Sequence, residues 1–176
     1  DDRAVLPPAE AKSISRESTF PKDVSDRKFL MATLRYLSER VGAELREHCK
    51  QARCVAIKVR YEDFTTITRQ RTLLQPADTD QTIFQTGAEL LRIALSTDKR
   101  AIRLIGTSVS QLNEPAGQLS LTEATDQRLE KLNRTIDRIR NKYGFTAIQT
   151  GRTLHLKDIF PEHGGDYTLP TPSLSR

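Results

Sequence analysis

The stretch from Arg53 to Leu73 constrains the fold of this chain more than any other part of its sequence. Its first half alternates strictly between two sets of side chains: Cys54, Ala56, Lys58 and Arg60 in one, and Val55, Ile57, Val59 and Tyr61 in the other. Successive side chains of a β-strand point to opposite faces, so the alternation predicts a strand with one buried side and one solvent-facing side. Glu62 and Asp63 then predict a short turn, and the threonine-rich run 64–72 predicts the returning strand of an antiparallel hairpin.

Positive charge is concentrated on the predicted strands. The four segments that we interpret as strands hold eight basic residues and a single acid, Glu17, in a chain whose net charge is +5. Lys58 and Arg60 lie on the solvent-facing side of the first hairpin strand, and Arg69 and Arg71 are expected to extend this basic face onto the second. A cationic sheet face suits a polyanion and favours nucleic acid as the partner, whereas basic residues that merely aid solubility are the simpler alternative.

The remaining periodic segments predict the fold class. Further strands are expected from Lys12 to Phe20, where Pro21 ends the run, and from Ala101 to Leu112. With two helices between them, the order is strand, helix, strand, strand, helix, strand. This is the α+β, ferredoxin-like order, in which both helices cover one face of a four-stranded antiparallel sheet. The other face is expected to remain open.

Both helices are predicted from an apolar stripe with a spacing of three and four residues. The stripes are Leu30, Leu34, Leu37, Val41 and Leu45 in the first helix, and Ile83, Gly87, Leu90, Leu91, Ala94 and Leu95 in the second. The first is expected to run from a cap at Asp23 or Ser25 to about residue 50, and the second from a cap at Asp78 or Thr79 to about residue 96. Asp78 and Asp80 are interpreted as acids that favour a helix N-terminus rather than as a metal pair. The remaining charged residues of the first helix are expected to form a solvated face: Arg27, Arg35, Arg40, Arg46, Glu39, Glu44 and Glu47.

The composition predicts five parts: a linker at residues 1–11, the sheet-and-helix domain at 12–112, a loop at 113–122, a third helix with a short strand at 123–155, and a polar tail at 156–176. The third helix is expected from Glu123 to Tyr143 and the short strand from Phe145 to Gln149. The apolar stripe of the third helix is Leu129, Leu132, Ile136, Ile139 and Tyr143. It is expected to pack on the domain, on a partner or on another copy of the chain.

Composition and motifs also exclude some classes of protein. No apolar run approaches the roughly 20 residues that a membrane span needs. Cys49 and Cys54 match no zinc or redox motif, which favours a reducing cytoplasm. No nucleophile–base pair or metal cluster is apparent, so we expect no cofactor and no catalysis by this chain alone. The opening DDRAV, without a methionine, suggests a fragment of a longer protein.

Three motifs in sequence carry a family resemblance. KSISRESTF at residues 12–20, TRQRTL at 68–73 and IRLIGTSVSQL at 102–112 together resemble the little-finger domain of Y-family DNA polymerases, especially the bacterial DNA polymerase IV branch. The resemblance implies a domain that lays its open sheet face on primer–template duplex during translesion synthesis. It also implies that the parent is a DNA-directed DNA polymerase, whose Mg²⁺-dependent nucleotidyl transfer occurs in a palm domain that this sequence lacks.

The resemblance implies which residues contact DNA phosphates. By position they are Ser13, Ser15 and Arg16 in the first strand, Thr68, Arg69 and Arg71 in the hairpin, and the stretch from Arg103 to Ser108 in the last strand. Lys58 and Arg60 join them from the alternation alone. Phosphate contacts position a protein without reading bases, so we expect weak binding without sequence preference. If about five phosphates are neutralised, log affinity falls with log salt at a slope of roughly −4 to −5.

A second motif follows the last predicted strand. The segment QLSL, consisting of Gln118, Leu119, Ser120 and Leu121, resembles the peptide by which bacterial polymerases bind the sliding clamp. Glutamine supplies a polar contact and the two leucines fill an apolar pocket. The alternative is that Thr122 caps the third helix while the leucines pack beside it. The expected partners are therefore duplex DNA and a sliding clamp, with no membrane.

A free-standing RNA-binding or protein-interaction domain of the same fold is the alternative function. An RNA-recognition sheet needs exposed aromatic side chains on which bases stack. The open face predicted here carries Lys, Arg and Thr instead, so a comparison of duplex DNA with single-stranded RNA discriminates between the two. A protein adaptor that acts through the third helix and QLSL is a further possibility.

Overall fold

Six elements in the predicted order form the core of the computed structural model, which describes residues 11–115 and 124–156. They are β1 (Ser13–Val24), α1 (Arg27–Glu47), β2 (Gln51–Tyr61), β3 (Thr66–Ala77), α2 (Asp80–Thr97) and β4 (Ile102–Asn113). A third helix, α3 (Ala124–Tyr143), and two short 3-10 helices follow, η1 (Phe145–Ala147) and η2 (Leu154–Leu156).

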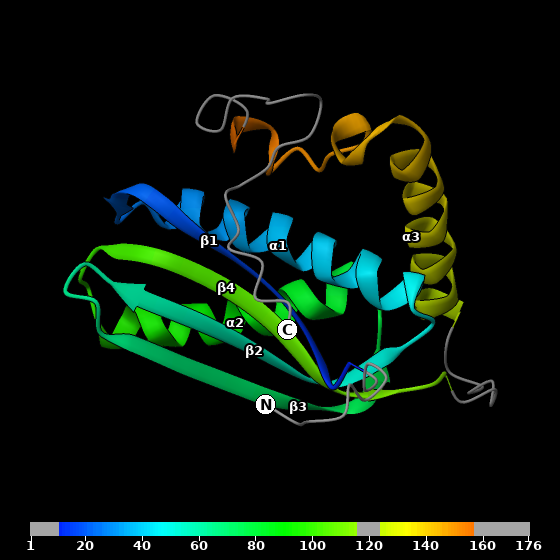
Figure 1. Cartoon of the computed structure of the whole chain (residues 1–176), viewed down its shortest axis with the longest axis horizontal. Helices are drawn as coiled ribbons and strands as arrows, with labels where there is room; N and C mark the ends of the chain where they lie inside the picture. The colour runs from blue at the N-terminus through cyan, green and yellow to red at the C-terminus, as the bar shows by residue number, and fades with distance from the viewer. Residues whose placement is uncertain (1–10, 116–123, 157–176) are drawn as a thin grey trace, which may run out of the picture.

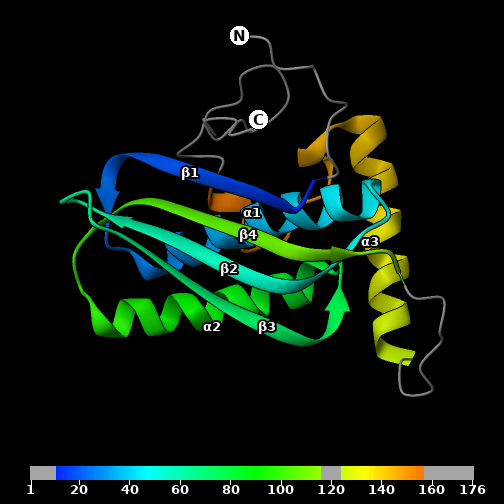
Figure 2. The same ribbon diagram turned by 60° about the horizontal axis from the view of Figure 1, so that its bottom comes forward.

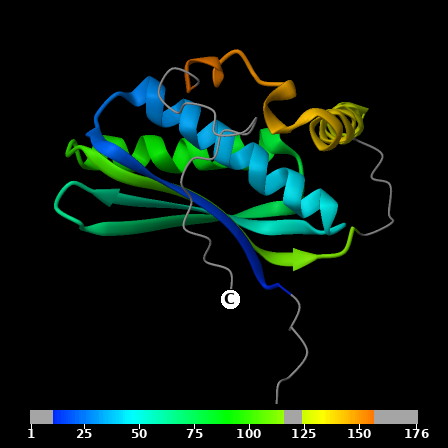
Figure 3. The ribbon, with the colours of Figure 1, turned by 45° about the horizontal axis from the view of Figure 1, so that its top comes forward.

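The four strands form one antiparallel sheet in the order β1-β4-β2-β3, which Figure 2 shows from one side. α1 and α2 lie together on one face of this sheet, and no described helix covers the other face (Figure 3). The predicted ferredoxin-like α+β fold is therefore confirmed. None of the helices in the described part of the chain has the length and apolar character that a bilayer crossing requires.

The core lies between the sheet and the two helices, along the predicted stripes. The fully buried side chains on the helices include Leu30, Leu34, Leu37, Val41, Leu45, Ile83 and Leu91. They pack against the inward side of β2, where Val55, Ile57 and Val59 are also buried. Burying each such side chain contributes about 1.5–3 kcal/mol, so both helices are held firmly to this face.

Two boundaries near the N-terminus differ from the prediction. β1 does not end at Pro21, because its pairing with β4 resumes at Val24 after a shift of register. The cap of α1 is Asp26, whose carboxylate accepts a hydrogen bond from the backbone N–H of the residue two positions on at 2.8 Å. The predicted caps, Asp23 and Ser25, are therefore wrong, since the extended strand runs almost to the helix.

The end of β3 differs from the prediction, whereas the start of α2 agrees with it. β3 continues to Ala77, beyond the loop predicted at Gln75 and Pro76. As an edge strand it has one unpaired side, which tolerates a proline without losing a ladder hydrogen bond. Thr79 caps α2, as predicted, by accepting a hydrogen bond from the N–H of Thr82 at 3.4 Å.

α3 packs beside the C-terminal part of α1 through ionic contacts (Figure 1). Arg140 donates to Glu39 at 2.6 Å, and both side chains are less than 5% exposed. Arg46 donates to both carboxylate oxygens of Asp137, at 2.6 and 2.9 Å. The face of α1 predicted to be solvated is therefore partly buried. Its buried charges, Glu39 and Arg46, are each compensated by an opposite charge from α3.

The apolar stripe predicted on α3 is only partly covered, with Leu129, Ile136 and Ile139 half-buried. Leu132 and Tyr143 are 53% and 65% exposed, whereas Asn133 and Arg140 on the adjoining side of the helix are buried. The strand predicted from residue 145 to 149 is also wrong, because this segment begins with η1. The ring of Phe145 stands edge-on to a tyrosine of α1 at 5.5 Å and lies 4.0 Å from the Arg140 guanidinium, away from any sheet edge.

Several predictions lie outside the described residues. They concern most of the linker at 1–11, the segment 118–121 with its cap Thr122, and the tail from residue 157.

Candidate nucleic-acid interface

The part of the uncovered side on which all four strands pair in register, here called the open face, is a grid of sixteen residues, four from each strand. The pairing register sets its rows: Ser13, Ser110, Cys54 and Thr72; Ser15, Ser108, Ala56 and Gln70; Glu17, Gly106, Lys58 and Thr68; Thr19, Leu104, Arg60 and Thr66. Directly opposed residues of an antiparallel sheet share a face. Half of the open-face residues carry a hydroxyl group, and none is aromatic.

Six of the predicted DNA-contacting residues lie on the open face: Ser13, Ser15, Lys58, Arg60, Thr68 and Ser108. They occupy all four strands. The orientation predicted for Lys58 and Arg60 agrees with the register, because the alternation within a single strand needs no knowledge of its neighbours.

Arg69 and Arg71 do not share this face, which corrects the prediction. Arg69 pairs with Ile57 and Arg71 with Val55, and both partners point into the core. Arg71 forms an ion pair with Glu89 of α2, on the helix side. A cationic face that spans β2 and β3 is therefore absent from the sheet.

The turn between β2 and β3 explains this reversal. A turn limited to Glu62 and Asp63 would place Arg69 and Arg71 on the open face. The observed turn has one residue more, because Phe64 adopts a positive φ of 66° and the Tyr61 N–H bonds to the carbonyl four residues on. A shift of one residue moves every side chain of a strand to the opposite face.

Arg16 also faces the helices. It pairs with Thr107, whose side chain is buried, and its guanidinium lies 2.6 Å from the carboxylate of Glu44 on α1. Arg16, which the resemblance implies as a phosphate contact together with Ser13 and Ser15, therefore lies on the opposite side of the sheet from them. In a strand, Arg16 must point away from both Ser15 and Glu17.

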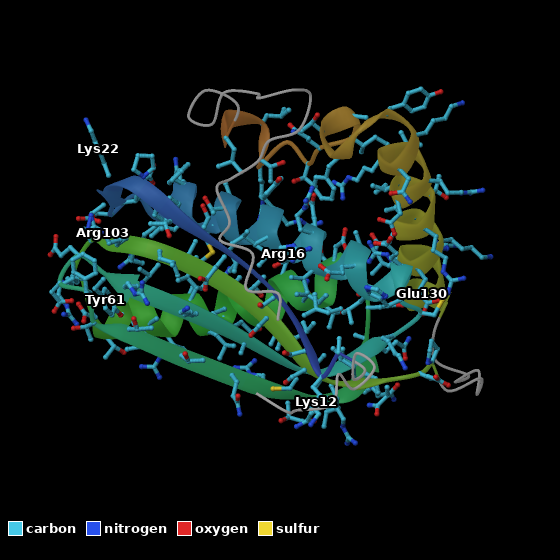
Figure 4. The ribbon with its side chains drawn as sticks, viewed as in Figure 1. Lys12, Arg16, Lys22, Tyr61, Arg103 and Glu130 are labelled. Atoms are coloured by element: carbon cyan, nitrogen blue, oxygen red, sulfur yellow. The ribbon has the colours of Figure 1, made fainter. Side chains whose placement is uncertain are left out.

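Arg103 lies at the turn end of the sheet, near Tyr61 (Figure 4). The pairing of β4 with β2 shifts beside it, so it belongs to no row of the open face. Its guanidinium is 4.6 Å from the ring centre of Phe64 and 3.5 Å from a carboxylate oxygen of Asp23. Of the predicted stretch from Arg103 to Ser108, the polar residue Ser108 lies on the open face with Leu104 and Gly106, and Arg103 borders it.

The charge on the open face is smaller than the sequence predicts. Its ionisable residues among the sixteen are Lys58, Arg60 and Glu17, apart from the thiol of Cys54. Lys58 Nζ donates to Glu17 Oε2 at 2.9 Å, and Arg60 Nε donates to Thr66 Oγ1 at 3.0 Å. The face is therefore rich in hydroxyl groups, with a formal charge of about +1.

A polar cluster borders the turn end of the open face. Arg100 lies 4.4 Å from the ring centre of Tyr61 and forms ion pairs with Asp63 and Asp98. Hydrogen bonds from Thr65 lower the pKa of Asp63, and hydrogen bonds from Arg100 lower that of Asp98. Both acids therefore stay ionised near neutral pH and compensate Arg100.

The described residues contain no group of three or more His, Cys, Asp or Glu side chains arranged to hold a metal ion. Asp78 and Asp80, at the start of α2, instead accompany Arg46, which donates to the Asp78 carbonyl oxygen at 2.6 Å and to Asp80 Oδ1 at 2.9 Å. Burial raises the pKa of Asp80 to about 6, although Arg46 opposes the shift.

In the sequence Glu17 is the single acid of the predicted strands, and nothing there connects it with Lys58. Glu17 and Lys58 both pair with Gly106, from opposite sides of β4. The available signal is the spacing of Ser15, Glu17 and Thr19, which lie two residues apart in a predicted strand and therefore share a face. The row that joins it to Lys58 depends on strand order, which alternation does not reveal.

Comparison with known proteins identifies similar sequences and folds. The model of the impB/mucB/samB family C-terminal domain matches residues 11–122. DNA polymerase IV of Dehalococcoides mccartyi is 51% identical over 160 residues, which cover 91% of this chain and 41% of the relative. DNA polymerase IV 1 of Mesorhizobium japonicum is 37% identical over 155 residues, 87% of this chain and 35% of the relative. The chain thus spans about two fifths of the length of these curated relatives.

Solved structures support the fold. A Y-family DNA polymerase chimera matches with a TM-score of 0.54 and 19% identity, covering 60% of this chain and 30% of the other. An insertion ternary complex of Dbh DNA polymerase matches with a TM-score of 0.52 and 17% identity, covering 58% and 29%. At these identities the likeness concerns the arrangement of strands and helices.

Proposed function

Because the chain belongs to the impB/mucB/samB family of C-terminal domains, as its match to DNA polymerase IV sequences also indicates, we propose that it binds duplex DNA without sequence preference. In this proposal it is the little-finger domain of a translesion polymerase, and its open face rests on the primer–template duplex. The observation that supports this most directly is a sheet face uncovered by any described helix, with hydroxyl groups on β1, β4 and β3 and the cations Lys58 and Arg60 on β2.

The chemistry of the open face suits phosphate more than bases. Serine and threonine hydroxyls and backbone N–H groups donate hydrogen bonds to phosphate oxygens and carry no sequence information. Stacking of unpaired bases needs aromatic side chains, and the sixteen open-face residues include none. A duplex backbone is therefore the preferred ligand, ahead of single-stranded RNA.

The revised charge distribution lowers the expected salt dependence. With Lys58, Arg60 and the bordering Arg103, the face neutralises about three phosphates at most, which gives a slope of roughly −2 to −3 in log affinity against log salt. A slope of roughly −4 to −5 would require cations from outside the open face to reach the DNA, among them Arg69 and Arg71 on the helix side.

Fluorescence anisotropy with a labelled primer–template duplex at several salt concentrations tests the proposal. Arg60→Gln is expected to weaken binding and make the slope shallower by about 0.9, the value for one phosphate. Arg71→Gln removes the same charge from the helix side and is expected to leave the slope unchanged.

Equal effects of the two substitutions would show that net charge holds the DNA, and would refute the open-face interface. Absence of duplex binding at low salt would refute DNA binding altogether. Tighter binding of single-stranded RNA than of duplex would favour the RNA-binding alternative.

We further propose that Gln118 to Leu121 binds the bacterial sliding clamp. Its support is the QLSL sequence and its position shortly after β4, and the segment lies outside the described residues. The double substitution Gln118→Ala and Leu121→Ala should abolish binding to a purified bacterial clamp while duplex affinity stays the same. Clamp binding that survives the substitution, or is missing in the unmodified chain, would refute this assignment.

A further inference from the structure

Glu17 is the one acid of the open face and forms an ion pair with Lys58 across the sheet. It lies on β1, Lys58 lies on β2, and both pair with Gly106 of the intervening strand β4. The Glu17 carboxylate accepts a hydrogen bond from Lys58 Nζ at 2.9 Å, above this glycine.

Gly106 makes room for this ion pair. A Cβ atom at position 106 would lie 2.9 Å from the Cβ of Glu17, closer than real Cβ atoms approach. The absence of a side chain lets Glu17 and Lys58 meet across β4. Glu17 and Lys58 lie in the third of the four rows of the grid. Ser15 lies in the row before it and Arg60 in the row after it.

The ion pair is accessible to a ligand on the open face. The Lys58 and Glu17 side chains are 33% and 17% exposed. A phosphate that approaches Lys58 must replace the Glu17 carboxylate as its partner and meets the repulsion of that carboxylate. A phosphate oxygen offers the ammonium the same kind of charge-assisted hydrogen bond as the carboxylate, so a phosphate that reaches Nζ can take its place.

We propose that Glu17 competes with DNA phosphate for Lys58 and thereby limits the affinity of the open face for duplex. The inference rests on the proposed DNA-binding function and adds a residue that regulates it. Glu17 holds the ammonium in place when no DNA is bound and lowers the charge that the face presents. The consequence is weak binding of duplex with fast dissociation, because the loss of one charge contact chiefly raises the dissociation rate.

Substitution of Glu17 separates this role from a merely structural one. Glu17→Gln keeps the size of the side chain and frees Lys58 for a phosphate, so duplex affinity should rise about fivefold at low salt and the salt slope should steepen by about 0.9. In a Lys58→Gln background the same substitution should have a much smaller effect, because the cation for which it competes is gone.

Glu89→Gln is the matched control. It raises the net charge by the same amount but lies on α2, where Glu89 pairs with Arg71 on the helix side. Anisotropy titrations of the full chain with a labelled primer–template duplex are expected to show little change for this variant. Far-UV circular dichroism and a thermal melt report whether each variant is folded, and Glu17→Ser replaces Glu17→Gln if the latter fails to fold.

The outcomes distinguish the inference from the function on which it rests. If the unmodified chain binds duplex and neither Glu17→Gln nor Glu17→Ser tightens binding beyond Glu89→Gln, the competition is refuted while DNA binding stands. Weaker binding by Glu17→Gln would also refute it, because Glu17 would then position Lys58 for DNA. If the unmodified chain does not bind duplex, the function itself fails.

Discussion

Replacing Arg140 with methionine tests whether α3 belongs to the folded domain. Arg140 Nη2 donates to Glu39 Oε2 at 2.6 Å, and the side chains of the pair are 4% and 3% exposed. The same guanidinium donates to the carbonyl oxygen of Ile148, at 3.0 and 3.2 Å, and lies 4.0 Å from the ring centre of Phe145. One side chain therefore links α1, α3 and the segment after α3.

The size of the effect follows from the charge that is left behind. Removing one partner of a buried ion pair costs about 3–5 kcal/mol, because the remaining charge stays buried without compensation. Glu39 keeps Arg35, whose Nε donates to Oε1 at 2.8 Å, so we expect the lower end, about 3 kcal/mol. That loss shifts the urea midpoint by roughly 1–2 M for a domain of this size.

Urea unfolding followed by circular dichroism measures the loss, with Arg138→Met as the control. Arg138 is an exposed residue of the same helix, and its guanidinium donates to Thr135 at 3.5 Å within that helix. Its substitution should change stability by less than about 0.5 kcal/mol. If Arg140→Met is as stable as Arg138→Met, the buried ion pair does not hold α3, and the account of its docking is wrong.

Two further predictions concern the ionic cluster at the start of α2. Burial raises the folded-state pKa of Asp80 from 3.8 to about 6, so the folded chain binds the proton of this carboxyl group more tightly than the unfolded chain does. The contribution of Asp80 to stability is therefore full below about pH 4 and falls as the pH rises to about 6. Asp80→Asn should remove up to about 3 kcal/mol of this pH dependence, measured as urea midpoints from pH 4 to 7; an unchanged pH profile would contradict the burial argument. Gly42→Ala should destabilise by about 1–3 kcal/mol, because its Cβ would fall inside contact distance of the Asp80 carboxylate and 3.0 Å from Arg46 Nη1. Gly87→Ala, whose Cβ would meet Leu34 and Ile57 side chains at 3.5–3.6 Å, is the control and should be tolerated, and equal melting temperatures for the two variants would count against the Gly42 prediction.

The fold was predictable from the sequence because its determinants are local. The alternation in β2 and the stripes of α1 and α2 each depend on one element, and the structure buries the predicted residues, among them Leu34, Ile57 and Leu91. The orientation of Arg69 was not predictable in this way. It depends on the number of residues in the turn, where Phe64 adopts a positive φ and adds the residue that reverses the face.

The docking of α3 was not predictable from the sequence, for a different reason. Glu39 and Arg46 look like residues of a solvated helix face when α1 is considered alone. Their partners, Arg140 and Asp137, lie 101 and 91 residues further along the chain. Periodicity finds an apolar stripe, but a docking face made of complementary charges has no periodic signature of its own.

The distribution of charge on the sheet changes what the net charge of the chain implies. Arg16 and Arg71 point to the helix side, where Glu44 and Glu89 compensate them, so neither adds an uncompensated charge to the open face. What remains on that face is mainly neutral hydroxyl groups, which bind phosphate by short-range hydrogen bonds that salt screens little. Under the proposed function, an interface of this kind would accept any duplex sequence and release it readily. The observable that separates it from a simple cationic surface is therefore the slope of affinity against salt rather than the affinity itself.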